Sequence, residues 1–160
     1  MILYHGGTDT VGKPLIRASL ASRDFGAGFY CTDIQSQAEK WAGRQGRIRK
    51  QSAVLNVYEF DIDSARQNLN CKFFSDYAID WLELVVNCRK DSRFTHEFDI
   101  VSGKIANDDV GETVQAVIGG LMPWDFALQK LAFMQANNQY CFCTETSLAF
   151  LKFVESAKLE

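Results

Sequence analysis

Short apolar runs and alternating apolar and polar positions recur along the chain, and both patterns are typical of β-strands. We predict strands over residues 2–4, 29–31, 53–62, 98–105, 139–144 and 148–154. The third is the clearest, because Tyr58, Phe60 and Ile62 share one face of an extended segment. The last is ambiguous between strand and helix, and the alternation of its apolar residues with Lys152 favours a strand.

Apolar residues at helical spacing predict helices between these strands. The first begins at Ser36, which forms a capping-box pattern with Glu39. Ala38, Trp41 and Ala42 fall on one face of that helix. Three more helices are predicted over residues 76–89, 109–119 and 123–135.

Ser75 precedes the second predicted helix and is its expected N-cap. Strands and helices do not alternate as repeated βαβ units, so the expected fold class is α+β, with two small packed β-sheets and flanking helices. The length of 160 residues and the apolar content of 47% suit one domain, residues 1–158, with 159–160 as an expected vector-derived tail.

Charge narrows the possible partners. The net charge is −3, whereas a protein that coats nucleic acid through its phosphates ordinarily has a basic excess. The clearest basic run comprises Arg44, Arg47, Arg49 and Lys50. We interpret this run as a solvated helix end, and the alternative is a rim that contacts phosphate groups. No stretch approaches the roughly 20 apolar residues of a membrane span.

The cysteines of the chain are Cys31, Cys71, Cys88, Cys141 and Cys143. Their odd number, without a C-x-x-C pair, favours reduced and mostly buried thiols in a cytoplasmic protein. Cys141 and Cys143 alternate and therefore share one face of a predicted strand. With only two histidines, His5 and His96, we expect no metal site. A reactive cysteine nucleophile would lack a histidine nearby in the sequence.

Three short motifs indicate a specific chemistry: Tyr4-His5-Gly6-Gly7, the segment Asp-Phe-Gly-Ala-Gly-Phe-Tyr over 24–30, and Asn138-Gln139-Tyr140. In this order and spacing they resemble the diphtheria-toxin-like ADP-ribosyltransferases, a superfamily that includes the catalytic domain of poly(ADP-ribose) polymerases. Over nearly its whole length the chain also resembles a bacterial family of domains of unknown function, number 3990.

The resemblance implies an ADP-ribosyltransferase-like fold with an NAD cleft, and NAD as the substrate. Cleavage between nicotinamide and ribose creates an oxocarbenium-like centre, whose positive charge the site must stabilise. By this resemblance the backbone of Gly6 binds the nicotinamide amide and His5 binds the adenosine ribose. Tyr30 stacks on the nicotinamide ring, and Trp41 is the expected second aromatic on its other face.

The same resemblance implies that Arg17 or Arg23 contacts the pyrophosphate. Two positions depart from the polymerase pattern. Gln139 stands where those enzymes have a glutamate, so it can bond a ribose hydroxyl but supplies no negative charge. Glu145 is the alternative carboxylate, although Thr-Glu is also a simple helix start. Ala38 stands where a serine would bind the nicotinamide amide.

We therefore expect an NAD-dependent mono-ADP-ribosyltransferase, with His5, Tyr30, Gln139 and Glu145 as catalytic candidates. The acceptor is an unknown macromolecule, expected to be a protein rather than a nucleic acid. The family resemblance implies a toxin-like bacterial effector with a small antitoxin-like partner protein. The alternatives are a non-catalytic module that binds NAD or ADP-ribose, an NAD glycohydrolase, and a transferase with a nucleic-acid acceptor. Each motif alone also fits a purely structural role.

Overall fold

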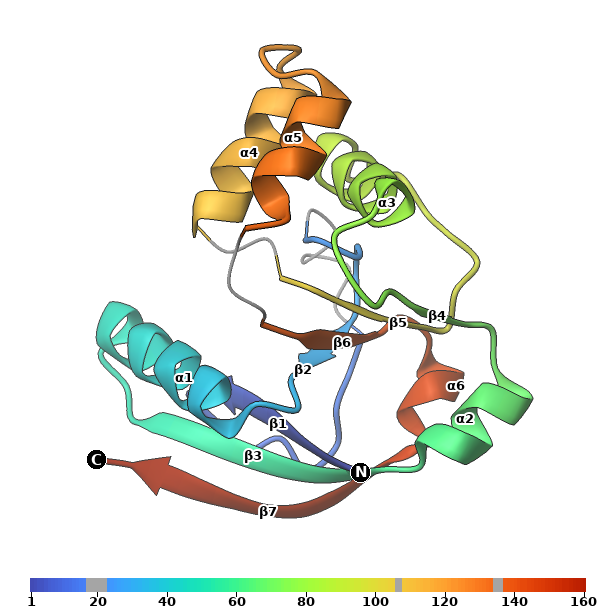
Figure 1. Ribbon diagram of the computed structural model, residues 1–160. Helices are drawn as coiled ribbons and strands as arrows, with labels where there is room; N and C mark the ends of the chain where they lie inside the picture. Colours follow the sequence, from blue (N-terminus) through green and yellow to red (C-terminus); the bar gives the residue numbers. More distant parts are fainter. Residues whose placement is uncertain (17–22, 106–107, 134–136) are drawn as a thin grey trace.

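The computed structural model describes residues 1–16, 23–105, 108–133 and 137–160 (Figure 1). The strands in this part of the chain are β1 (Ile2–Gly7), β2 (Phe29–Cys31), β3 (Ala53–Phe60), β4 (Cys71–Phe73), β5 (Ile100–Gly103), β6 (Gln139–Phe142) and β7 (Leu151–Leu159). The helices are α1 (Gln35–Arg49), α2 (Ile62–Asn68), α3 (Ile79–Lys90), α4 (Asp108–Ile118), α5 (Trp124–Leu131) and α6 (Glu145–Leu148).

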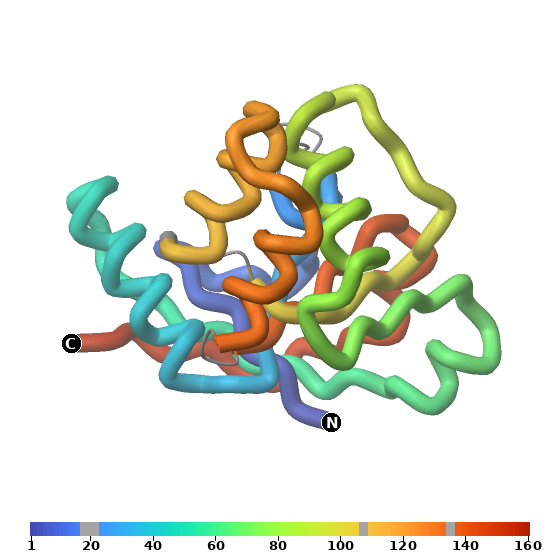
Figure 2. Tube along the Cα trace, turned by 45° about the horizontal axis from the view of Figure 1, so that its top comes forward, coloured from blue at the N-terminus to red at the C-terminus, as the bar shows by residue number. Residues whose placement is uncertain are grey.

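The strands form two small sheets, which confirms the predicted α+β class. One sheet has three antiparallel strands in the order β1-β3-β7. The other has the order β2-β6-β5-β4, with β4 and β5 parallel and the remaining pairs antiparallel. Helix α1 packs on β1 and β3, whereas α3, α4 and α5 stand together on the four-stranded sheet (Figures 1 and 2).

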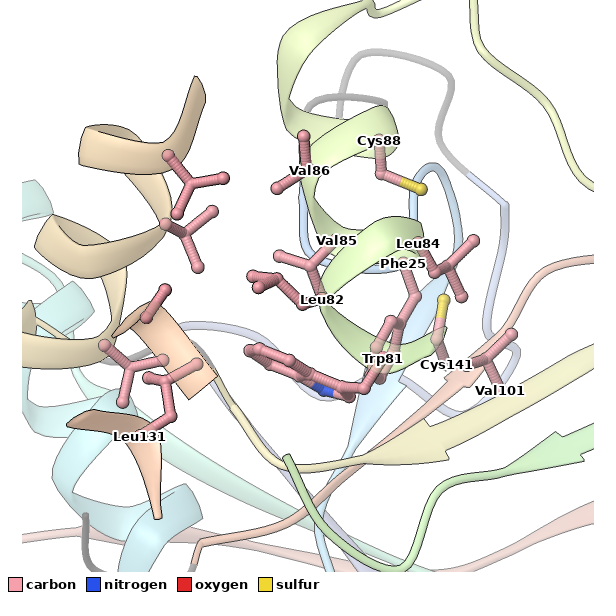
Figure 3. Packing of buried hydrophobic residues seen from close by; sticks show 14 residues of the cluster. Phe25, Trp81, Leu82, Leu84, Val85, Val86, Cys88, Val101, Leu131 and Cys141 are labelled. Atoms are coloured by element: carbon pink, nitrogen blue, oxygen red, sulfur yellow. The ribbon is translucent and has the colours of Figure 1, made fainter. Parts of the chain in front are cut away.

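Two apolar clusters fill the interior. The first lies between the four-stranded sheet and helices α3 to α5, where Trp81 and Leu82 extend from α3 toward Leu131 of α5 (Figure 3). The second joins the two sheets and includes Tyr58 and Phe60 of β3. The four-stranded sheet is therefore covered on both faces, with one cluster against each.

Each predicted strand and helix has a counterpart, but several boundaries and caps were wrong. Helix α1 begins at Gln35 after Ile34, which provides no side-chain cap, so Ser36 lies inside the helix. Glu39 instead accepts a hydrogen bond from Gln35 Nε2 (2.7 Å). Helix α3 likewise begins after Ala78, three residues beyond the predicted cap Ser75.

The short elements α2, β4 and α6 were missing from the prediction, because three to seven residues carry too little periodicity. Ile62 opens α2 rather than ending β3, since the Asp61 carboxylate accepts from the Ser64 N–H (3.0 Å) and caps a helix there. The predicted strand over 148–154 divides into α6 and the longer strand β7.

Two glycines of α1 give a test of this packing. A methyl group at Gly46 would lie 2.8 Å from the Gln51 carbonyl oxygen and 3.2 Å from the Ala53 nitrogen, both backbone atoms. At Gly43 it would only touch the Arg47 side chain at 3.7 Å. We expect Gly43→Ala to stabilise the protein by about 0.5–1 kcal/mol through helix propensity. Gly46→Ala should destabilise it, and equal effects of the two changes on the urea midpoint would contradict this packing.

Candidate functional site

The two sheets are joined where β1 passes β2. The Tyr4 N–H donates to the Thr32 carbonyl (2.7 Å), and the Thr32 N–H donates back to the Tyr4 carbonyl (2.9 Å). The next pair of a continued ladder would be Gly6 and Tyr30, but this bridge is an isolated one. Because alternate residues of a strand direct their backbone groups to the same edge, Gly6 presents its N–H and C=O on this edge.

The His5 side chain makes a hydrogen bond where the backbone pair of Gly6 and Tyr30 is missing. Its Nδ1 lies 2.7 Å from the Tyr30 carbonyl oxygen, and its ring stacks on Phe29 with the ring centroids 4.5 Å apart. A carbonyl only accepts, so Nδ1 carries the proton and Nε2 is an acceptor in the neutral imidazole. His5 is thus fixed in the tautomer whose Nε2 is an acceptor.

Gly6 lies directly beneath α1. A Cβ atom at this position would overlap the Ala38 carbonyl oxygen and lie 2.9 Å from the Ala42 nitrogen. The glycine is therefore required by the close approach of α1 to β1, and this contact also fixes the start of the helix beside the strand edge.

Tyr30 and Trp41 both lie close to one cation. The Arg23 Cζ atom is 5.8 Å from the centroid of the Tyr30 ring and 5.8 Å from that of the Trp41 ring. Arg44 approaches Trp41 as well, at 5.9 Å. Trp41 is 40% exposed, so it is not the core residue that its helical face suggested, although Ala38 and Ala42 are buried. The paired aromatics form a cation-binding arrangement at the mouth of the β1–β2 junction.

The hydroxyl of Tyr30 anchors the preceding turn. It donates to the Gly26 carbonyl (2.6 Å) and accepts from the Phe25 N–H (3.2 Å). Burial raises the pKa of Tyr30 well above its ordinary value, so the phenol keeps its proton and remains a donor. In the same turn Gly26 has φ of 80°, and a Cβ at Gly28 would overlap the Cys141 sulfur.

Gln139 is buried beside an ion pair that the sequence did not reveal. Its Nε2 donates to Asp24 Oδ2 (2.8 Å), and Arg89 Nε donates to Asp24 Oδ1 (2.8 Å). Only 8% of Gln139 and 6% of Asp24 are exposed. The carboxylate orients the amide so that Nε2 is engaged and Oε1 is left as the acceptor for another group.

Glu145 lies away from this arrangement. It is exposed at the first position of α6, after β6 ends, whereas Gln139 opens β6. Thr144 caps that helix in a capping box with Ser147, which matches the structural alternative for Thr-Glu. The structure thus brings Arg23 to Tyr30 and Trp41 and joins His5 to the Tyr30 carbonyl, whereas Gly6 packs against α1 and Gln139 bonds Asp24. Arg17 lies outside the described residues.

A separate cavity of about 360 Å³ opens on the other face of β6. Tyr140 and Asn138 line it together with Asp33, Arg66 and Lys104, while Tyr30 and Gln139 do not. Alternation along β6 explains this division, because Tyr140 faces away from Gln139.

Within the ranges that the structure describes, no group of three or more His, Cys, Asp or Glu side chains could hold a metal ion. No helix in those ranges is both long and apolar enough to cross a membrane. The basic residues Arg47, Arg49 and Lys50 are exposed at the C-terminal end of α1, where the helix dipole stabilises positive charge.

Residues 1–153 match the model of DUF3990, described as a protein of unknown function. The chain belongs to the DUF3990 family. No curated protein and no solved structure matches it. The family therefore covers both the β1–β2 junction and the buried Asp24–Gln139 pair, and its description assigns no activity to them.

The sequence predicted Gln139, Tyr30 and His5 as site residues but gave no sign that Gln139 pairs with Asp24 or that Asp24 pairs with Arg89. Asp24 is the first residue of the second motif, so the sequence showed its type and position but not the residue that it pairs with. Arg89 lies on α3, 65 residues away, and no local pattern distinguishes it from other exposed helix ends.

Gln139→Glu tests the buried arrangement. The new carboxylate would face Asp24 Oδ2 across 2.8 Å, so its pKa in the folded protein should lie above its unfolded value of about 4.3. A raised folded pKa means that stability is retained below about pH 4.3 and lost as pH rises through the folded value. The stability deficit relative to wild type should therefore be larger at pH 8 than at pH 5 in urea unfolding. A deficit independent of pH would contradict the observed contact.

Proposed function

We propose that this DUF3990 chain binds NAD at the β1–β2 junction and transfers one ADP-ribose from it to a macromolecular acceptor. The observation that carries the proposal is the Arg23 guanidinium, which lies 5.8 Å from the ring centroids of both Tyr30 and Trp41. Nicotinamide in NAD is a planar cation, as guanidinium is, so the same two rings suit both groups. Arg23 then leaves the rings when nicotinamide enters and becomes available to the pyrophosphate.

The neighbouring groups fit the rest of the ligand. The edge of Gly6 offers one donor and one acceptor, which match the carbonyl and amino group of the nicotinamide amide. Nε2 of His5 is an acceptor suited to a ribose hydroxyl, because Nδ1 is engaged by Tyr30. Both groups belong to the junction at which the two sheets meet.

Gln139 acts in this proposal through a hydrogen bond and not through charge. Its Oε1 accepts from a ribose hydroxyl while Asp24 holds its Nε2. The Asp24 charge behind it is offset by Arg89, so little negative potential reaches the reacting sugar. A carboxylate 4 Å from that sugar could contribute about 4 kcal/mol at an effective dielectric near 20. Its absence favours single transfer over chain elongation.

The same observation favours a second candidate, a non-catalytic module that binds NAD or ADP-ribose. The neutral amide of Gln139, hydrogen-bonded to the Asp24 carboxylate that Arg89 neutralises, is sufficient for binding without bond cleavage. Hydrolysis of NAD is a third outcome, in which water replaces the acceptor. In the proposal the protein works in the cytoplasm as a toxin-like effector with a small antitoxin-like partner, as the family resemblance implies.

NAD should stabilise the protein, and Trp41→Ala should weaken its binding about fivefold or more, since losing a cation–aromatic contact costs about 1 kcal/mol. At 100 times its dissociation constant NAD adds about 2.7 kcal/mol of stability, which thermal unfolding can detect. The matched control is Trp124→Ala, because Trp124 is 37% exposed and lies on α5. Equal NAD affinity of the two variants, or no thermal shift of the wild type at millimolar NAD, would refute the aromatic site.

Transfer is tested by incubating the protein with NAD labelled in the adenylate and a bacterial lysate. The proposal expects labelled protein, with at least a hundredfold loss in Gln139→Ala, since removing one stabilising group in a site costs about 2.7–4 kcal/mol. Gln129→Ala, an exposed glutamine of α5, is the control that should retain activity. Free nicotinamide without labelled macromolecule indicates hydrolysis, and NAD binding without turnover supports the binding module.

A further inference from the structure

Two cysteine sulfurs lie in contact next to Tyr30. The Sγ atoms of Cys141 and Cys143 are 3.4 Å apart. Cys141 is completely buried under α3, next to Phe25 and Val101 (Figure 3), whereas Cys143 is partly exposed. In its thiol form Cys143 donates to the Cys141 sulfur and to the Cys141 carbonyl oxygen (3.5 Å), so the two side chains are held against each other.

The surroundings of Cys143 favour its thiolate. The Cys143 sulfur is in contact with the Cys141 sulfur, and its neighbours Cys141, His96 and the backbone of Val101 lower its pKa below the ordinary value despite burial. His96 is held in place, because its Nε2 donates to the Phe25 carbonyl (2.9 Å) and its Nδ1 accepts from the Phe98 N–H (3.2 Å). A partly exposed thiolate with a neighbouring thiol is the arrangement of redox-sensitive cysteine pairs.

We propose that Cys143 is a peroxide-sensitive thiol and that Cys141 resolves its sulfenic acid into an intrachain disulfide. The Cys143 thiolate attacks one oxygen of hydrogen peroxide, the O–O bond breaks, and hydroxide leaves. Cys143 is thereby oxidised to sulfenic acid and the peroxide is reduced. The Cys141 sulfur then attacks the Cys143 sulfur, the S–O bond breaks, and the Cys141 proton leaves with the hydroxyl group as water.

The backbone allows this bond. Residues two apart in extended chain have Cα atoms about 6.6 Å apart. Disulfides accept Cα separations up to about 6.8 Å, so the sulfurs need only close from contact to about 2.05 Å. Cys143 lies just beyond the end of β6, and its N–H donates to the Asp99 carbonyl (2.8 Å), so the side chains rather than the backbone must close this distance.

Other cysteines of the chain are poorer targets. Burial raises the pKa of Cys88 to about 12, and burial also raises that of Cys31 well above its ordinary value. Cys71 is partly exposed like Cys143, but burial and the Asp99 carboxylate raise its pKa, and its S–H donates to the Ala65 carbonyl (3.6 Å). Cys71 is therefore the matched control thiol.

The test treats the reduced full-length chain with hydrogen peroxide and dimedone, a trap for sulfenic acids, followed by alkylation and peptide mass spectrometry. In the wild type the peptide holding Cys141 and Cys143 should lose two hydrogens, and dithiothreitol should restore them. In Cys141→Ala the resolving thiol is gone, so dimedone should accumulate on Cys143. Cys71 should react about tenfold more slowly than Cys143, and Cys71→Ser should behave as the wild type.

Modification of Cys71 as fast as that of Cys143 would overturn the assignment. Equal dimedone labelling of Cys143 in wild type and Cys141→Ala would overturn the resolving role of Cys141. The wild-type measurement alone decides the disulfide if Cys141→Ala fails to fold. NAD plays no part in the readout, so this outcome is independent of the proposed transferase activity.

Discussion

The pair of backbone hydrogen bonds between Tyr4 and Thr32 joins the two sheets, and the candidate site depends on its position. Because the ladder stops at this bridge, the edge of β1 at Gly6 faces the junction rather than another strand. His5 uses the free carbonyl of Tyr30 to hold the strands together beyond the bridge. The close approach of α1 to Gly6 then brings Trp41 to the side of Tyr30.

Charge balance explains what such a site can do. Without a ligand, the Arg23 guanidinium already lies close to both aromatic rings. An incoming cation must therefore displace Arg23 from them. Arg89 neutralises the Asp24 carboxylate, and one oxygen of that carboxylate accepts a hydrogen bond from Gln139. In the proposed function, this charge distribution suits recognition of a planar cation and orientation of a sugar hydroxyl, with little electrostatic assistance to bond cleavage.

The sequence predicted the long elements well because they leave local signals, while the role of the motif residues stays a prediction. Tyr58 and Phe60 alternate as a strand requires, and His5 and Tyr30 stood in recognisable segments. The prediction that the first helix begins at Ser36 was wrong, because a capping-box pattern does not specify which residue of a turn begins the helix. The pairing of Asp24 with Arg89 and the approach of Arg23 to Trp41 arise from tertiary packing between different elements. Cys141 and Cys143 were assigned to one face correctly, but His96 reaches them only through the fold.

The most direct measurement of the central claim is a crystal structure of the protein with NAD bound. The account predicts the nicotinamide ring between Tyr30 and Trp41, its amide on the backbone of Gly6, and Arg23 displaced from the rings. NAD bound instead in the cavity lined by Arg66 and Lys104, with Arg23 still close to both aromatic side chains, would contradict it.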